Sequence, residues 1–268
     1  MSFRDFLTSR PALKRIALFL FRARAPFGSF VPFAALRGYS RLFSDWRRFR
    51  TLGGRASVLD FYPCLFDNRA KSSIDAHYFH QAVWAFTKIC RTRPLRHVDV
   101  GSEVNYVGML TAVVPVTFVD IRPLELTIPN YEGLSGSVLS MPFPDGSVES
   151  LSSLHVIEHI GLGRYGDPLD PLGSVKAARE IVRVTRNGGR AYISVPIGRS
   201  RVQFNGQRVF AIDEVLNMFT GLRLAELSVV DPSGRFIQAV AADQLVIDDT
   251  NTGADCCLGL FEFIKDET

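Results

Sequence analysis

Short apolar runs alternate with stretches of helical periodicity along residues 97–264. This alternation is typical of parallel strands joined by crossover helices, which places the chain in the α/β class. Strands are predicted at 97–100, 116–120, 138–143 (a short strand and turn), 151–155, 190–195, 224–230 and 258–264. Helices are predicted at 106–113, 172–185 and 212–219, and Asn187-Gly188-Gly189 supplies a left-handed stop for the second of them. The pattern therefore predicts a Rossmann-like, doubly wound, mostly parallel sheet of about seven strands.

The sequence before this domain has a different character. Residues 76–90 have helical periodicity, and 51–75 are rich in turn-forming residues. Residues 1–50 are basic and aromatic, and a helix is predicted over 12–24, opened by Pro11 and ended by Pro26. We therefore expect three parts: a basic, aromatic helical extension over 1–50, a loop and helix leading into the core over 51–95, and the Rossmann domain over 96–268.

The charge is unevenly distributed. The formal net charge is +4, yet residues 1–50 hold eleven Lys and Arg against two Asp, so the rest of the chain carries −5. On the helix over 12–24, Leu13, Ile16 and Leu20 share one face. Three interpretations of this helix stay open: it packs on the main domain with extended arginines, it rests on an anionic membrane surface, or it contacts nucleic acid.

Composition excludes several classes of protein. A hydrophobic fraction of 47% excludes wholesale disorder. The four cysteines form no CxxC pair, which argues against a disulfide framework and a cysteine zinc site. No apolar run approaches the roughly 18–20 residues that span a bilayer, and the run at 16–21 is shorter than a signal-peptide core. We expect a cytoplasmic protein, with peripheral contact at the inner membrane face through residues 12–24 as a further hypothesis. The oligomeric state is open.

Acidic residues lie near the carboxyl ends of the first two predicted strands. Asp99 precedes Gly101 by two residues, and Asp120 ends the second strand 21 residues after Asp99. A glycine there lets the backbone approach a ligand, and an acid at that distance is placed to hold the hydroxyls of a nucleoside ribose. The other interpretation is that these carboxylates only cap helices.

Three later motifs carry a family resemblance: Met141-Pro-Phe-Pro-Asp-Gly-Ser147, His155-Val-Ile-Glu-His159 and Asn187-Gly-Gly189. Over about residues 97–200 the chain resembles the class I S-adenosylmethionine-dependent methyltransferases. The stretches Gly161–Asp167, Phe204-Asn205 and Gly259–Phe263 are similar to an uncharacterised branch, the domain-of-unknown-function family numbered 268. That family is often placed among polysaccharide-assembly proteins, and its reaction is not established. The resemblance implies a class I methyltransferase sheet and S-adenosylmethionine as the cofactor.

Carried onto this sequence, the resemblance implies a set of cofactor-binding residues: Asp99, Gly101, Ser102, Glu103, Asp120, Ile121, Ser137 and Val138. Two departures from the family pattern weaken the methyl-donor assignment. Glu103 and Asn105 stand where the first motif usually has glycines, and Glu103 would bring a negative charge close to the amino-acid end of the cofactor. Ser137 replaces the acid that accepts a hydrogen bond from the adenine amino group.

The motif after the fourth strand offers a base for a hydroxyl acceptor. His155 and His159 are the candidate catalytic residues, with Glu158 placed to orient one of them. The other interpretation is that each histidine only bonds to backbone. The same residues spell the inverted zinc-protease motif, HxxEH. No histidine follows His159 and His155 ends a strand, so we expect no metal.

Two loops are candidates for the acceptor site. The loop at 161–168 is rich in glycine, and the loop at 198–208 is basic within an acidic domain. Arginine guanidinium groups match phosphate or carboxylate. The expected substrate-binding residues are Arg164, Tyr165, Asp167, Arg199, Arg201, Asn205 and Arg208. The other interpretation is a solvated charged loop.

The leading hypothesis is a methyltransferase acting on a small-molecule or glycan- or lipid-linked acceptor with an anionic group, such as a nucleotide-sugar or a lipid-linked diphosphate. The alternative is a methyltransferase-fold binding or scaffold protein whose donor pocket has lapsed. A nucleic-acid substrate is not expected, because the domain is acidic and the Asn/Asp-Pro-Pro-aromatic motif of base methylators is missing.

Overall fold

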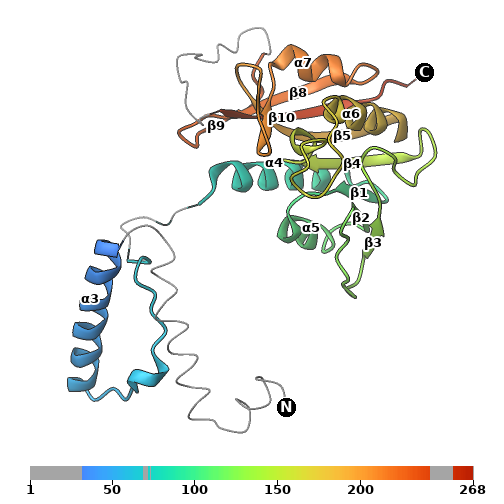
Figure 1. Cartoon of the computed structure of the whole chain (residues 1–268). Helices are drawn as coiled ribbons and strands as arrows, with labels where there is room; N and C mark the ends of the chain where they lie inside the picture. The colour runs from blue at the N-terminus through green and yellow to red at the C-terminus, as the bar shows by residue number, and fades with distance from the viewer. Residues whose placement is uncertain (1–31, 69–71, 73, 242–255, 268) are drawn as a thin grey trace, which may run out of the picture. The chain divides into compact units, whose positions relative to one another are not determined.

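The computed structural model describes residues 32–68, 72, 74–241 and 256–267 (Figure 1). The chain divides into two compact units, residues 1–73 and 74–268. The helix expected over 12–24 lies outside the described residues. Among the helices of the described part, none combines the length and the apolar character that a membrane crossing needs.

The described part of the first unit is a helix followed by a returning segment. Helix α3 (Pro32–Thr51) begins at a proline, which suits the first helical position because its missing N–H would have no helical partner. The 3-10 turn η2 (Val58–Asp60) lies on the returning segment. Phe61 on that segment contacts the rings of Phe43 and Trp46, each at 5.6 Å between ring centres. Ring packing therefore joins the two arms of this unit.

The second unit contains a sheet in the order β3-β2-β1-β4-β5-β10-β8-β9. Its strands are β1 (His97–Val100), β2 (Val116–Asp120), β3 (Tyr131–Ser135), β4 (Val148–Leu154), β5 (Thr185–Ile197), β8 (Arg223–Val230), β9 (Phe236–Ile237) and β10 (Cys257–Ile264). Strands β1 to β5 pair in parallel, whereas β10 pairs antiparallel with both β5 and β8. The predicted fold class is confirmed. The eighth strand, β9, is a two-residue addition at the edge.

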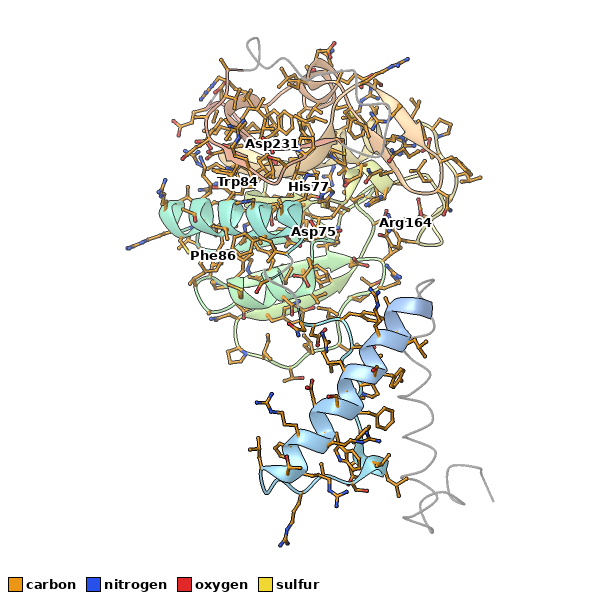
Figure 2. All side chains as sticks on the ribbon, turned by 90° about the vertical axis from the view of Figure 1, so that its left-hand side faces the viewer. Asp75, His77, Trp84, Phe86, Arg164 and Asp231 are labelled. Atoms are coloured by element: carbon orange, nitrogen blue, oxygen red, sulfur yellow. The ribbon has the colours of Figure 1, made fainter. Side chains whose placement is uncertain are left out.

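Helices cover both faces of this sheet (Figure 1). Helices α4 (Ala76–Thr92) and α5 (Val104–Leu110) lie on one face, and α6 (Gly173–Val184) and α7 (Ile212–Met218) lie on the other. Neighbouring residues of β5 show the division, because side chains alternate along a strand. Tyr192 packs with Trp84 of α4 (Figure 2), whereas Ile193 joins the core under α6 and α7. The sheet therefore has two separate cores.

Three predicted elements differ from the structure. The third strand is β3, not 138–143; β3 lies at the sheet edge with largely exposed side chains, so no apolar run marks it. Strand β5 begins directly after α6, so Asn187-Gly188-Gly189 lies within the strand range and does not end the helix. The loop expected at 198–208 contains a hairpin of β6 (Arg201–Gln203) and β7 (Gln207–Val209).

Candidate functional site

A pocket of about 440 Å³ lies at the carboxyl ends of β1, β2 and β4. Ligands of open α/β sheets bind at this edge, where neighbouring strands have connections that run in opposite directions. Six residues expected from the sequence line it: Gly101, Ser102, Glu103, Asp120, His155 and Tyr165. Six lining residues were not expected: Tyr78, Val104, Phe118, Arg122, Leu124 and Leu154. The sequence signal for Tyr78 was the aromatic run at 77–79 that opens α4.

Gly101 and Asp120 form one end of the pocket. Gly101 has φ +68°, a conformation that favours glycine, and a Cβ there would lie 3.2 Å from Val156 and 3.5 Å from Asp120 Oδ2. Asp120 Oδ1 accepts a hydrogen bond from the backbone N–H of Arg122 at 2.7 Å. Among the described residues, none donates a hydrogen bond to Asp120 Oδ2. One carboxylate oxygen is therefore available to a ligand beside the glycine.

Glu103 is turned toward the helix that follows it. It is the N-cap of α5, and its Oε2 accepts from the backbone N–H of Tyr106 at 3.1 Å. Its Oε1 accepts from Asn105 Nδ2 at 2.6 Å. The first turn of the helix thus holds the carboxylate. A negative charge is favourable there, because the N-terminus of a helix carries partial positive charge. The pocket beside Glu103 stays open.

Asp99 lies beneath the pocket and does not line it. It is completely buried and accepts hydrogen bonds from the backbone N–H of Ser102, at 3.0 Å, and from the hydroxyl of Ser152. Burial raises its pKa to about 6. The expectation that Asp99 contacts the cofactor is therefore corrected: its carboxylate holds the turn at 100–102.

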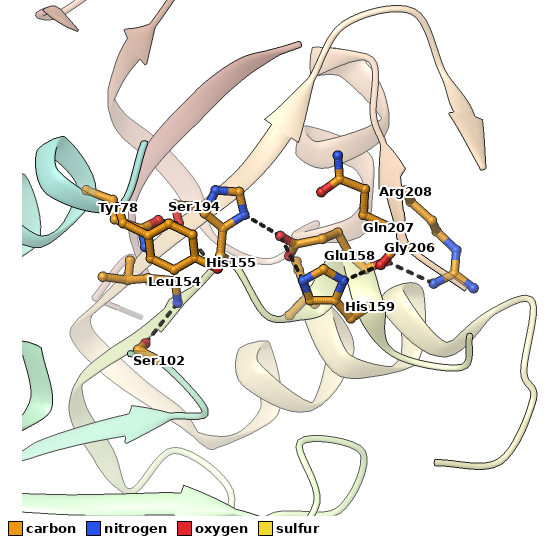
Figure 3. Close-up of polar contacts among 12 residues, drawn as sticks. Tyr78, Ser102, Leu154, His155, Glu158, His159, Ser194, Gly206, Gln207 and Arg208 are labelled. Carbon is orange, nitrogen blue, oxygen red and sulfur yellow. Dashed lines mark hydrogen bonds and ion pairs between the residues drawn. The ribbon is translucent and has the colours of Figure 1, made fainter. Parts of the chain in front are cut away.

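His155 has the most constrained position in the pocket (Figure 3). Its backbone is left-handed, with φ +56°, and its N–H donates to Ser194 O at 3.1 Å. The ring stacks on Tyr78 with centres 5.1 Å apart, and Nδ1 lies 2.6 Å from Glu158 Oε1. Because an ionised carboxylate only accepts, Nδ1 carries the hydrogen and the lone pair of the neutral ring is on Nε2.

Glu158 is fully buried, and its second oxygen, Oε2, has no hydrogen-bond partner among the described residues. It lies in η3 (Ile157–His159), directly after β4. Among the described residues, its carboxylate is paired with two histidines: His155, with Nδ1 2.6 Å from Oε1, and His159, with Nε2 3.7 Å from Oε1. Within this part of the chain, the charge of Glu158 is therefore balanced only when one of these two imidazole rings is protonated.

His159 lies outside the pocket. Its Nδ1 donates to the backbone carbonyl of Gly206 at 2.7 Å, at the tip of the β6–β7 hairpin. Burial lowers its pKa, so the ring is neutral at pH 7. This arrangement matches the interpretation in which the histidine bonds to backbone. Of the two candidate bases, the structure places only His155 at the pocket.

The remaining cofactor candidates are not among the residues that line the cavity. Ile121 is exposed, and Val138 is buried in the core under α6 and α7. The Ser137 hydroxyl accepts from the backbone N–H of Leu139 at 3.2 Å, which closes a local turn. Contacts of these three residues with the cofactor stay a prediction.

Two arginines converge on Tyr165 at the pocket wall. The guanidinium carbons of Arg122 and Arg164 each lie 5.1 Å from the centre of the Tyr165 ring. Arg164 donates to the carbonyl of Gly206 at 3.2 Å. In the part of the chain that the structure describes, no carboxylate forms an ion pair with either arginine. Two guanidinium groups therefore lie beside the Tyr165 ring without an ion-pair partner among the described residues.

The other expected acceptor residues build the loops. Asp167 accepts from the backbone N–H groups of Gly161 and Tyr165, at 2.6 and 3.3 Å, and Arg201 donates to the carbonyl of Arg199 at 3.0 Å. Asn205 has φ +62° at the hairpin turn. Arg208 is buried and donates to Ile160 O at 2.6 Å, to Ser174 Oγ at 3.0 Å and to Asp170 O at 3.2 Å. Arg208 is therefore corrected from a substrate ligand to a cross-link between the hairpin and the loop at 160–171.

In the described residues, no three histidine, cysteine, aspartate or glutamate side chains are grouped as a metal ion requires.

Part of the chain is similar to a known protein family. Residues 145–233 match the model of the DUF268 family, described as a Caenorhabditis protein of unknown function. The predicted resemblance is confirmed. This DUF268 segment begins just before β4 and ends after β8, so it supplies His155, Glu158 and Tyr165, whereas Gly101 and Asp120 precede it. No curated protein matches the sequence significantly.

Solved structures show the same fold. A putative sarcosine dimethylglycine methyltransferase from Galdieria sulphuraria has a TM-score of 0.51 at 14% identity, over 84% of this chain and 98% of that one. The [4+2]-cyclase SpnF has a TM-score of 0.50 at 15% identity, over 75% and 86% of the two chains. The protein therefore has a class I methyltransferase fold, and the family match and this fold do not determine its reaction.

Proposed function

We propose that the protein is an S-adenosylmethionine-dependent methyltransferase that modifies a hydroxyl group of a small-molecule or glycan- or lipid-linked acceptor. The observation that carries the proposal is that one pocket combines groups suited to bind a nucleoside with a candidate base. Asp120 Oδ2 and Gly101 are suited to the nucleoside, and His155, paired with Glu158, is the candidate base. The volume of about 440 Å³ lies in the range of ligand pockets.

The residues present fit this cofactor. Asp120 would accept hydrogen bonds from the ribose hydroxyls, and the backbone at Gly101 and Ser102 would lie against the amino-acid end. When bound, S-adenosylmethionine supplies a methyl group already activated by its sulfonium. The protein therefore has to position the acceptor and take its proton, and both tasks are met by ordered side chains.

His155 is suited to take the proton. Glu158 fixes its Nδ1–H, which leaves Nε2 as the accepting atom of a ring that lines the pocket. On accepting a proton at Nε2, the ring becomes an imidazolium whose Nδ1–H already points at a carboxylate. The buried Glu158 charge stabilises that cation. Stacking against Tyr78 keeps the ring in this orientation.

The wall beside Tyr165 supports an acceptor with an anionic group. Arg122 and Arg164 flank the ring without a carboxylate partner among the described residues, so a phosphate or carboxylate there would gain two charge-assisted contacts. A nucleotide-sugar or lipid-linked diphosphate meets this requirement, in line with the polysaccharide role that the family resemblance implies.

Cofactor binding tests the proposal most directly. We expect titration calorimetry with S-adenosylhomocysteine to show saturable binding, which Asp120→Ala weakens at least tenfold, because hydrogen bonds to a charged acceptor contribute about 1.5–3 kcal/mol each. The matched control Asp213→Ala, an exposed acid on α7, leaves affinity unchanged. His155→Ala also keeps the affinity, since its role is toward the acceptor. Equal affinity of Asp120→Ala and the unaltered protein would refute this placement of the nucleoside.

A binding or scaffold protein is the second candidate. Ser137 lacks the acid expected beside the adenine, and its hydroxyl is used in a local turn. SpnF, a structure of similar fold, is named a [4+2]-cyclase. The fold therefore does not by itself imply methyl transfer. Absence of binding at millimolar S-adenosylhomocysteine, with the protein folded, would favour this candidate.

We also propose a cytoplasmic location. Cys64 is exposed and Cys90 is partly exposed, and both carry free thiols. Exposed thiols persist in reducing compartments. Labelling by a membrane-impermeant maleimide only after cell lysis would support this location.

A further inference from the structure

The described part of the first unit exposes several large apolar side chains. Within residues 34–68 the exposed ones are Leu36, Phe43, Phe49, Leu52, Leu59 and Tyr62. Leu52 is 79% exposed and Leu36 is 65% exposed. In the same range the buried hydrophobic residues are Ala35, Phe61 and Leu65. A partner that accepts apolar side chains would therefore stabilise this surface.

The charge of the same segment restricts the partner. Residues 32–68 carry six arginines and no lysine, against three aspartates. None of the six arginines forms an ion pair with a carboxylate within the described residues. Arg48 and Arg50 lie in the last turn of α3, where cations also favour the helix dipole. The dipole does not account for Arg37, Arg47 or Arg55, so the excess positive charge favours an anionic partner.

A hollow at the end of α3 combines both chemistries. It has a volume of about 710 Å³ and is lined by Trp46, Arg50, Arg55 and the backbone at 53–58. The Trp46 indole N–H donates to Ala56 O at 3.0 Å, which ties the loop to the helix. The Arg50 guanidinium lies 5.1 Å from the centre of the Trp46 ring. A phosphate in this hollow would meet two guanidinium groups beside an indole.

We propose that residues 32–68 form a docking element for an anionic phospholipid surface. The hollow takes a lipid phosphate between Arg50 and Arg55, and the exposed side chain of Leu52, next to the hollow in the sequence, enters the boundary between headgroups and acyl chains. Tryptophan and tyrosine favour that boundary, and arginines favour anionic headgroups. Nucleic acid fits less well, because it offers no apolar medium for the exposed leucines. The proposal does not depend on the methyltransferase assignment, and it rests on residues beyond the helix expected at 12–24.

Vesicle co-sedimentation of the full chain tests the proposal. We expect binding to phosphatidylglycerol–phosphatidylcholine vesicles, weak binding to pure phosphatidylcholine, and loss of binding as salt rises. The double variant Arg50→Gln/Arg55→Gln weakens binding by about 25-fold, since each arginine near an anionic surface contributes about fivefold. Leu52→Ser weakens it by about tenfold through lost apolar burial.

Matched controls on the second unit separate a local effect from a general one. Arg91→Gln/Arg179→Gln removes two exposed arginines from α4 and α6, and Leu95→Ser removes a leucine that is 86% exposed. Neither control changes vesicle binding if residues 32–68 are the docking element. Controls that weaken binding as much as the test variants would overturn the proposal, as would no binding by the unaltered protein. Binding to single-stranded RNA that competes with vesicles and is unaffected by Leu52→Ser would identify a nucleic-acid surface instead.

The two proposals fail separately. S-adenosylhomocysteine calorimetry on Arg50→Gln/Arg55→Gln gives the affinity of the unaltered protein if only docking is lost. Circular dichroism of each variant shows whether α3 remains folded.

Discussion

Replacing Asp99 by asparagine probes a buried polar network beneath the pocket. His97 bridges Ser150 and Ser152, with 2.8 Å at each ring nitrogen, and Ser152 also contacts Asp99. Asparagine keeps an oxygen for the Ser102 N–H and offers an amide donor to Ser152. The serine–histidine bonds can reverse direction, because a hydroxyl either donates or accepts and neutral histidine has two tautomers. The substitution therefore removes the charge at little hydrogen-bonding cost.

The structure gives the size and sign of the effect. Burial raises the pKa of Asp99 from 3.8 to about 6, so between these values the folded state binds a proton that the unfolded state lacks, and stability falls as pH rises. The difference corresponds to about 3 kcal/mol. Burial lowers the pKa of His97 from 6.5 to about 3, so stability rises with pH through that window. The two contributions oppose each other from pH 4 to 6, and Asp99→Asn leaves the histidine contribution alone.

Urea unfolding at steps between pH 4 and 7 measures the difference. The background Trp46→Phe leaves Trp84, which packs against the sheet of the second unit, as the fluorescent reporter. We expect the free energy of unfolding of Asp99→Asn, relative to its parent, to increase by about 2 kcal/mol from pH 4 to 6, because both pKa values lie near the ends of this range. Asp170→Asn is a control whose difference should stay nearly flat over this range: the bond from Lys176 lowers the pKa of Asp170, so the contribution of that carboxylate is present above its unfolded pKa and is lost only as pH falls below the range. A difference for Asp99→Asn that is flat with pH would refute a raised pKa.

Two further predictions concern the loop after β4 and the buried carboxylates. Gly161→Ala should lower the free energy of unfolding by at least about 2 kcal/mol, because φ is +81° and a Cβ would lie 2.1 Å from Asp170 O. Gly108→Ala in α5 should raise the free energy of unfolding by about 0.5–1 kcal/mol, because the space around its Cβ is open. Thermal denaturation compares the two variants. Glu262→Gln should cost about 3 kcal/mol because it breaks a buried ion pair, whereas Glu158→Gln should change stability by less than about 1 kcal/mol; comparable losses in urea unfolding would contradict this contrast.

The strands that the sequence predicted well are those with buried apolar side chains. Strands β1 and β2 have the predicted bounds because they are short, central and bounded by turn residues. Strand β3 was missed because the edge of the sheet tolerates exposed polar residues, as in Tyr131–Ser135. The β6–β7 hairpin was missed because its strands have three residues each and no apolar alternation. The local sequence pattern thus predicts strands with buried apolar side chains. It does not predict strands of polar residues that form only through pairing with distant segments.

The site was predictable where a residue follows a central strand. Gly101 and His155 come directly after β1 and β4, Asp120 is the last residue of β2, and parallel strands bring their carboxyl ends together. Arg208 was misplaced because a guanidinium in a basic loop has the same sequence signal whether it binds a substrate or backbone carbonyls. Tyr78 was missed because α4 was taken only as a core helix; its first turn reaches His155.

The contrast between two buried carboxylates supports the proposed catalytic role of the His155–Glu158 pair. Glu262 is 5% exposed and is held by Lys88 at 2.7 Å and by Arg190, so permanent cations balance its charge. Glu158 is more deeply buried, has no such cation, and leaves one oxygen without a partner among the described residues. A carboxylate whose purpose was stability would be better served by an arginine or by replacement with an apolar residue. A carboxylate whose role is to stabilise protonated His155 needs no permanent cation beside it, because its positive partner forms only when His155 takes up the proton.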